Sequence, residues 1–205
     1  INKVKAIGLA DSYNLCGALE FAEKISKVGT QPIIGTQINL LSDNHIGKIT
    51  LYATSEKGYK NLTNLSSLSY LKNKNSNDPS CEINDLVFNN EDLILLTGNY
   101  NNFFGKLFYA NKTKYFEKII EKLKFSFKDR MYIEIQRHSE SQESNFENYL
   151  FKISSLYNLP LIAGQEVYYL DSEMAEAHDA LICIGEKKFI DDQNRFRYSS
   201  QHYLK

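Results

Sequence analysis

Apolar residues recur at helical spacing in four stretches of the chain, and each stretch predicts a helix with one buried face. The first stripe stops at Gly29, a residue that favours the end of a helix because it adopts the left-handed conformation easily. A fifth helix is predicted from about Ser172 to Ile184. The four stripes are Ala18, Phe21, Ala22, Ile25 and Val28; Leu62, Leu65 and Leu68; Phe116, Ile119, Ile120, Leu123 and Phe127; and Phe146, Tyr149, Leu150, Ile153 and Leu156.

Short apolar runs typical of strands lie between these helices. Most of them precede a helix, and this alternation predicts a parallel sheet, open or closed into a barrel, in one α/β domain. The low-complexity segment from Lys72 to Ser80, "KNKNSNDPS", predicts a surface loop inside that domain. The strand runs are Ala6–Ala10, Pro32–Leu40, Lys48–Ala53, Leu93–Thr97, Met131–Gln136 and Leu161–Ala163.

Composition narrows the class of protein. The 205 residues carry a formal net charge of −1, so charge alone does not indicate nucleic-acid binding. The sequence contains no run of 18 apolar residues, so it predicts no membrane-spanning helix. Lys3 and Lys5 interrupt any signal-peptide pattern. Cys16, Cys81 and Cys183 are far apart and form no Cys-x-x-Cys pair, which argues against zinc or disulfides and favours a reduced, cytoplasmic location.

Polar residues stand where the predicted strands end, the usual place for chemistry in α/β enzymes. In the "ADSYN" segment, Asp11 is either a ligand or base or a turn and helix-cap residue, beside Ser12 and Asn14. Gln37 lies in the "IIGTQINL" segment of the second strand run, directed toward the same rim, and is either a ligand contact or a hydrogen-bonded amide. Lys48 begins the third strand, where a solvated cation is the plainest interpretation.

Later strand ends offer further candidates. The segment Thr97–Asn99 contains Gly98 and predicts a tight turn. Arg137 and His138 end the next strand, where they could bind phosphate together, although a lone histidine is more often structural. Glu166 and Tyr168 are two residues apart, so an extended segment places them on one side.

Other patterns do not assemble a site. His178 and Asp179 are adjacent in a predicted helix, so they cannot share one face. Neither a His-x-His nor a His-x-x-x-His motif occurs, and no glycine-rich phosphate loop occurs. A basic group raises the alternative of nucleic-acid binding, but interleaved acidic residues favour a solvated helix face. The basic residues are Lys118, Lys122, Lys124, Lys128 and Arg130, and the acidic ones are Glu117, Glu121 and Asp129.

Several strings occur together that are distinctive as a set: "LADSYNLCGALEF", "GYKNL", "EIQRH", "AEAHD" and "DDQNRFR". From about Ala6 to Lys205 the chain resembles the PHP (polymerase and histidinol phosphatase) domains of bacterial DNA polymerase III alpha subunits. The resemblance implies a distorted (βα)7 barrel similar to a TIM barrel. It also implies that residues 1–205 are a PHP domain without its first strand, and that a polymerase core using Mg²⁺ follows residue 205.

Active PHP domains bind a cluster of zinc or manganese ions, which activates water for phosphoester hydrolysis. The resemblance assigns six of the family's ligand positions to Ser12, Gln37, Lys48, Asn99, Glu166 and Tyr168. Only Glu166 is a good ligand, and a protonated Lys48 has no lone pair and repels a dication. The resemblance therefore implies no metal and no catalytic residue here. Other family-motif residues are Asp11, Asn14, Arg137, His138, His178 and Asp179.

The resemblance thus implies a silent structural scaffold that docks the proofreading exonuclease subunit epsilon, in a cytoplasmic replicative DNA polymerase (a nucleotidyltransferase). Its expected partners are epsilon, the other holoenzyme subunits, and DNA through the rest of the protein, with no membrane. The alternative is an active metal-dependent PHP phosphoesterase or 3′–5′ exonuclease, which would need zinc or manganese. A hypothesis for the silent site is an ion pair between Lys48 and Glu166 in place of metal.

Overall fold

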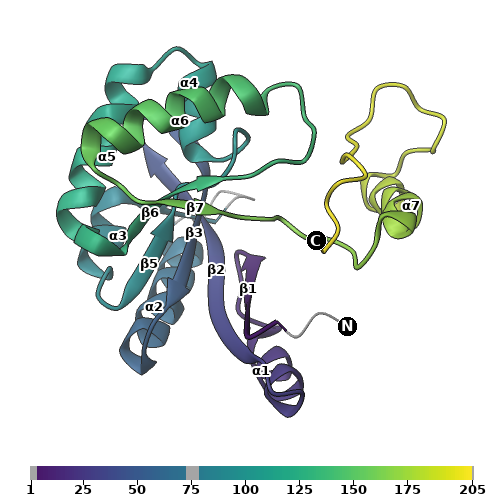
Figure 1. Cartoon of the computed structure of the whole chain (residues 1–205), viewed down its shortest axis with the longest axis horizontal. Coiled ribbons are helices and arrows are strands. Elements are labelled where there is room, and N and C mark those ends of the chain that lie inside the picture. The colour runs from purple at the N-terminus through teal and green to yellow at the C-terminus, as the bar shows by residue number, and fades with distance from the viewer. Residues whose placement is uncertain (1–3, 73–78, 205) are drawn as a thin grey trace.

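The computed structural model describes residues 4–72 and 79–204, and it is a mixed α/β fold built on a curled, half-barrel sheet (Figure 1). The hydrogen-bonded strand order is β1-β2-β3-β5-β6-β7, and β4 pairs with β2. The central residues of the predicted Lys72–Ser80 loop, 73–78, lie outside the described residues. The strands are β1 Ala6–Ser12, β2 Gln31–Ser42, β3 His45–Ala53, β4 Ser80–Glu82, β5 Leu93–Leu96, β6 Met131–Ile135 and β7 Leu161–Ala163.

The prediction of a parallel sheet is wrong for one strand. β3 runs antiparallel to both of its neighbours, β2 and β5, whereas the other pairs are parallel. Asp43 and Asn44, with φ of 44° and 65°, join β2 to β3. A two-residue connection with positive φ makes a hairpin and leaves no room for a crossover helix. The reversal places Lys48 opposite Asn39 on β2.

All five predicted helices are present, and Gly29 follows the first of them with φ of 79°, as its sequence position indicates. The pattern missed α3 and α4, because six or seven residues are too few to establish a 3.6-residue period. The helices are α1 Ala18–Lys27, α2 Glu56–Lys72, α3 Ile83–Phe88, α4 Phe103–Tyr109, α5 Thr113–Phe127, α6 Glu143–Tyr157 and α7 Ala175–Glu186, with 3₁₀ turns Lys128–Arg130 and Ser172–Met174.

One hydrophobic core holds the sheet and helices α2 to α6 together. It includes an aromatic group in which Phe104 packs edge-on against Phe103 and Phe116, with ring centroids 5.4 Å and 5.0 Å apart. Along the chain, the residues of this core run from Ile38 to Leu159. The strands therefore have one side fixed by packing. A polar rim is formed by residues at the carboxyl ends of β1, β5 and β6, together with Gln37 within β2 and Lys48 on the antiparallel β3.

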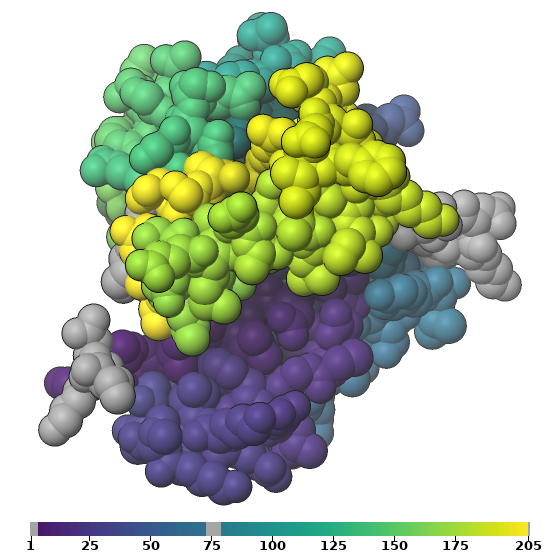
Figure 2. Space-filling model, turned by 90° about the vertical axis from the view of Figure 1, so that its right-hand side faces the viewer, coloured from purple at the N-terminus to yellow at the C-terminus, as the bar shows by residue number. Residues whose placement is uncertain are grey.

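The C-terminal unit, residues 165–204, is different. Its fully buried residues are Tyr169, Cys183 and His202, and none of them belongs to the main core. Figure 1 shows α7 and the final segment standing to one side of the sheet, and Figure 2 shows them across one face of the molecule. Among the described residues, no helix is long and apolar enough to cross a membrane.

Candidate functional site at the strand-end rim

The first half of the rim is a hydrogen-bonded chain from three strands. Ser12 on β1 pairs in register with Gln37 on β2, and its Oγ donates to Gln37 Oε1 at 2.9 Å. Lys48 on β3 donates from Nζ to Ser12 Oγ at 2.9 Å, and its ammonium lies 5.3 Å from the centre of the Tyr13 ring. Three positions that the resemblance links to metal binding are thus joined to one another by neutral and cationic groups.

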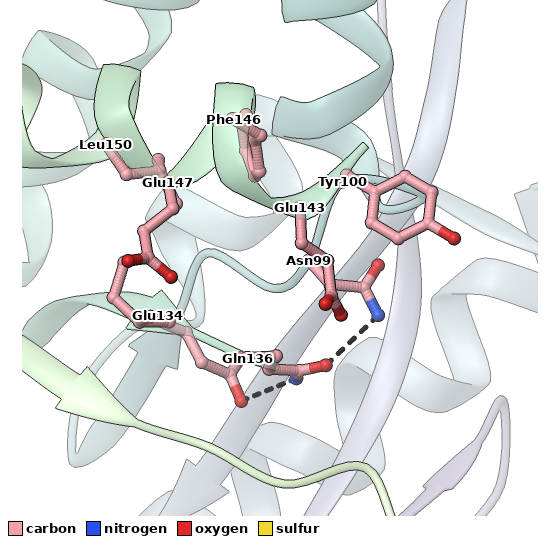
Figure 3. A pocket seen from close by; sticks show the side chains of 9 residues that line it. Asn99, Tyr100, Glu134, Gln136, Glu143, Phe146, Glu147 and Leu150 are labelled. Carbon is pink, nitrogen blue, oxygen red and sulfur yellow. Dashed lines mark hydrogen bonds between the residues drawn. The ribbon is translucent and has the colours of Figure 1, made fainter. Parts of the chain in front are cut away.

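The second half comes from β5, β6 and the segment after β7. Asn99 Nδ2 donates to Gln136 Oε1 at 3.1 Å and to Glu166 Oε2 at 3.5 Å, and Gln136 Nε2 donates to Glu134 Oε1 at 2.8 Å. Figure 3 shows the row from Asn99 through Gln136 to Glu134 beside a cavity of about 10 Å³. Gly98, with φ of 79°, makes the predicted turn that aims Asn99 into this row.

Glu134 is a buried carboxyl group with one unsatisfied oxygen. It is 6% exposed, and its Oε2 has no hydrogen-bond partner among the described residues. Burial raises the pKa of Glu134, while the hydrogen bond from Gln136 opposes the shift and the Glu166 carboxylate adds to it. Desolvation and the second carboxylate therefore both favour the neutral form of Glu134.

Electrostatics rather than direct contact joins the two halves. Burial lowers the pKa of the Lys48 ammonium, and the Glu166 carboxylate partly restores it. No ion pair within 4.0 Å links these two described side chains, so the hypothesis of a direct pair is wrong. Lys48 is held by Ser12 instead, and Glu166 accepts from Asn99, because each finds a nearer partner on its own half of the rim.

Glu166 and Tyr168 lie on one side of the segment after β7, as their spacing predicts. Both side chains lie beside His202: its Nδ1 is 4.0 Å from Glu166 Oε2, and its ring centroid is 5.4 Å from that of Tyr168. Desolvation raises the pKa of the Tyr168 phenol, and the Glu166 carboxylate raises it further. The phenol therefore stays protonated and is not a phenolate ligand at neutral pH.

These rim residues do not fit a divalent metal cluster. A metal needs deprotonated donors such as imidazole or carboxylate. The six positions that the resemblance links to metal binding offer a hydroxyl, two amides, an ammonium, a protonated phenol and one carboxylate, and burial favours the neutral form of the nearby Glu134. Within residues 4–72 and 79–204, no group of three or more His, Cys, Asp or Glu side chains is placed to hold a metal ion.

Two candidates near β1 have local roles. Asp11 follows the strand alternation and points away from Ser12, with its Oδ2 beside Gly17 at the start of α1. Asn14 donates from Nδ2 to the Ser12 carbonyl at 3.0 Å and accepts from the Cys16 amide at 2.9 Å. Asn14 therefore shapes the turn between β1 and α1, and Asp11 is not part of the rim network.

Arg137 and His138 do not form a joint phosphate site. Arg137 is exposed and holds both carboxylate oxygens of Glu147 on α6, at 2.7 and 2.9 Å. His138 is 1% exposed, and its Nδ1 lies 3.2 Å from Glu143 Oε1. Neighbouring residues in an extended segment face opposite sides, which separates the two side chains.

His178 and Asp179 point to different partners, as predicted for adjacent residues of a helix. The His178 ring stacks on Tyr168 with a centroid distance of 5.2 Å. Asp179 holds the guanidinium of Arg195 through both carboxylate oxygens, and this pair lowers the pKa of Asp179. Both residues therefore stabilise the C-terminal unit.

The sequence alone did not indicate three residues of the site. Glu134 near the end of β6 and Gln136 just after it are two residues apart, a signal that could have placed both on the face that carries the rim network. His202 gave no such signal, since it lies in an irregular segment and reaches the rim only through the tertiary fold.

Comparisons with known proteins identify the family of this chain. The model of the PHP domain family matches residues 2–138. DNA polymerase III subunit alpha from Caulobacter vibrioides is 33% identical, covering 99% of this chain and 18% of that protein. The subunit alpha from Rickettsia bellii is 36% identical over 99% of this chain and 17% of its own length. The chain therefore spans less than a fifth of these relatives.

A solved structure from Bifidobacterium adolescentis, described as a candidate metal-dependent phosphoesterase, aligns with a TM-score of 0.48 and 10% identity. It covers 80% of this chain and 77% of its own. The family match includes β1 to β6 and the first part of the rim. The chain belongs to the PHP domain family, and along its whole length it is similar to alpha subunits of bacterial DNA polymerase III.

Proposed function

We propose that the chain is the PHP domain of a bacterial DNA polymerase III alpha subunit, folded as a distorted (βα)7 barrel, and that this domain is catalytically silent. It serves as a structural scaffold and docking site for the proofreading subunit epsilon. The full-length protein then carries DNA-directed DNA polymerase activity, with Mg²⁺ held in a polymerase core beyond residue 205. Similarity to the alpha subunits over 99% of the chain supports this assignment.

The observation that carries the proposal of silence is the ammonium of Lys48 at a family ligand position. It donates to Ser12 Oγ at 2.9 Å, so its positive charge lies among the side chains at the positions that the resemblance links to metal binding. A cation there repels a dication, and the amides of Gln37 and Asn99 supply no charge to compensate. Ser12, Gln37 and Lys48 are hydrogen-bonded to one another without an ion, which supports a scaffold rather than a hydrolase.

Metal content tests the silence. The natural full-length protein would be purified without chelator, offered zinc, dialysed and analysed for bound metal per polypeptide. We expect about 0.1 equivalent or less for the wild type, and a clear gain for the triple variant Ser12→His, Gln37→Glu, Lys48→His, which restores ligand types. The triple variant is the matched control for metal bound elsewhere in the protein.

About two equivalents of zinc on the wild type, lost on Glu166→Gln, would contradict the proposal and support the active phosphoesterase or exonuclease. Release of nucleotides from a DNA 3′ end, measured with the same two proteins, would then identify the activity.

Docking of epsilon is tested separately. Hydrogen exchange of the full-length protein would be compared with and without purified epsilon, after co-elution has shown that a complex forms. We expect slower exchange in one or more peptides of residues 4–204. A complex that forms with every one of these peptides unchanged would place the docking site elsewhere.

A further inference from the structure

The contacts within the C-terminal unit, residues 165–204, are numerous. Gln165 Nε2 donates to the Gln201 carbonyl at 2.7 Å, and the Tyr168 amide donates to the His202 carbonyl at 2.9 Å. The Tyr169 hydroxyl donates to the Ser199 carbonyl at 2.8 Å. The bidentate Asp179–Arg195 pair ties α7 to the segment that follows it. The two ends of the unit are thus held to each other.

The contacts between this unit and the rim are fewer and consist of a ring stack and hydrogen bonds. The rings of His138 and His202 stack face to face, with centroids 3.9 Å apart and an interplanar angle of 4°. Ser199 Oγ donates to the His138 carbonyl at 2.6 Å, and Asn99 Nδ2 reaches Glu166 at 3.5 Å. The unit adds no residue to the main hydrophobic core, so these polar and ring contacts contribute much of its attachment to the rest of the domain.

The interface between the C-terminal unit and the rest of the domain, called the seam below, contains a cavity and a buried nitrogen without a hydrogen-bond partner among the described residues. A cavity of about 60 Å³ lies along it, lined from the body by Asn99, Tyr100 and His138 and from the unit by residues that include Tyr198 and His202. His138 Nε2 is buried there without a hydrogen-bond partner among the described residues. Protein interiors are normally close-packed, and a buried orphan nitrogen favours any state in which water reaches it.

We propose that the C-terminal unit is a hinged cover for the end of the rim formed by Asn99, Gln136 and Glu134, docked by the His138–His202 stack and able to open as one body. The hinge is the Gly164–Gln165 step, since the Gly164 amide is still bonded to Ile135 on β6 while Gln165 is bonded within the unit. Opening exposes His138 and the polar seam while the core stays folded. This inference does not depend on the proposed function.

Chemical labelling of His138 tests the cover. In the natural full-length protein at a fixed neutral pH, diethyl pyrocarbonate would be applied briefly and each modified histidine located by mass spectrometry. His138 is labelled only when the cover is open, because it is 1% exposed in the docked state. Alkylation of Cys81, which is 1% exposed in the main core, reports global opening in the same sample.

The neighbouring serines provide a matched pair of variants. Ser199→Ala removes the bond to the His138 carbonyl, whereas Ser200 is exposed. We expect Ser199→Ala to raise His138 labelling about threefold to tenfold and Ser200→Ala to leave it unchanged. His202→Ala, which removes the stack, should raise it by about tenfold, and His202→Phe, which keeps a ring, should restore most of the protection.

Cys81 alkylation should stay constant throughout. Equal His138 labelling in Ser199→Ala and Ser200→Ala would overturn the proposal. So would the absence of His138 labelling in every variant, or a rise that Cys81 alkylation matches, because each would mean that the seam opens only when the whole domain unfolds.

Discussion

The body of the domain, residues 4–72 and 79–164, and the C-terminal unit, residues 165–204, are stabilised by different forces. The body buries a continuous set of Leu, Ile and Phe side chains between the sheet and five helices. The C-terminal unit leaves large apolar residues such as Leu181, Ile184 and Phe189 exposed and relies on ion pairs, backbone bonds and stacked rings. Apolar burial is insensitive to pH and to single polar changes, whereas polar and ring contacts are sensitive to both.

The largest expected effect lies in the core of the body. Phe104 is fully buried between Phe103 and Phe116, so Phe104→Ala should lower the free energy of opening of the β2–β3 hairpin by about 3–5 kcal/mol. Phe189→Ala, in the C-terminal unit at 79% exposure, should change it by less than about 0.5 kcal/mol. Hydrogen exchange of β3 amides measures the opening free energy of the hairpin in both variants. Equal changes in Phe104→Ala and Phe189→Ala would contradict the proposed difference between the two regions.

A moderate effect is expected from pH. Burial, and then the neighbouring His138, lowers the pKa of docked His202 below its ordinary 6.5. The docked unit therefore binds fewer protons than the open one, so docking is fully stable above pH 6.5 and weakens as pH falls below it, by up to about tenfold per pH unit. The charged or titratable groups facing the stack are Glu140, Glu143, Glu166, Tyr100, Tyr168, His178, Arg197 and Tyr198.

Amide exchange of residues 165–169 at pH 7.5 and 5.5 tests this, with His202→Gln measured at each pH so that the intrinsic exchange rate cancels. We expect the pH effect in the wild type and not in His202→Gln. His45→Gln is the control, since His45 contacts Tyr115 outside the unit. A His202→Gln protein as sensitive to pH as the wild type would assign the effect to another group.

The smallest effect is expected at Lys48. Its ammonium is half-buried and its pKa is lowered by burial, so Lys48→Met exchanges a desolvated charge for an apolar chain of similar length. Relief of the desolvation cost offsets the lost hydrogen bond to Ser12, and we expect a change within about 1 kcal/mol in the opening free energy of the hairpin. A loss of about 3 kcal/mol would show that the rim network depends on this cation.

Much of the fold follows from local pattern. The stripe from Phe116 to Phe127 became a helix with its apolar face in the core, and Gly29 ends α1 as its type indicates. β3 was misassigned because strand direction depends on the connection, and the turn at Asp43 and Asn44 is decided by two positive φ values. Apolar alternation is the same in parallel and antiparallel strands, so it carries no information on direction.

The candidate site divides in the same way. The sequence by itself determined which groups are available at the rim, including an ammonium and amides at positions that the resemblance links to metal binding. Only the tertiary structure decided their partners: Lys48 with Ser12, Glu166 with Asn99, Arg137 with Glu147, and His138 with a histidine 64 positions away. The reason is physical, because residue type sets charge and donor capacity, whereas pairing depends on sheet register and on the path of the chain after β7.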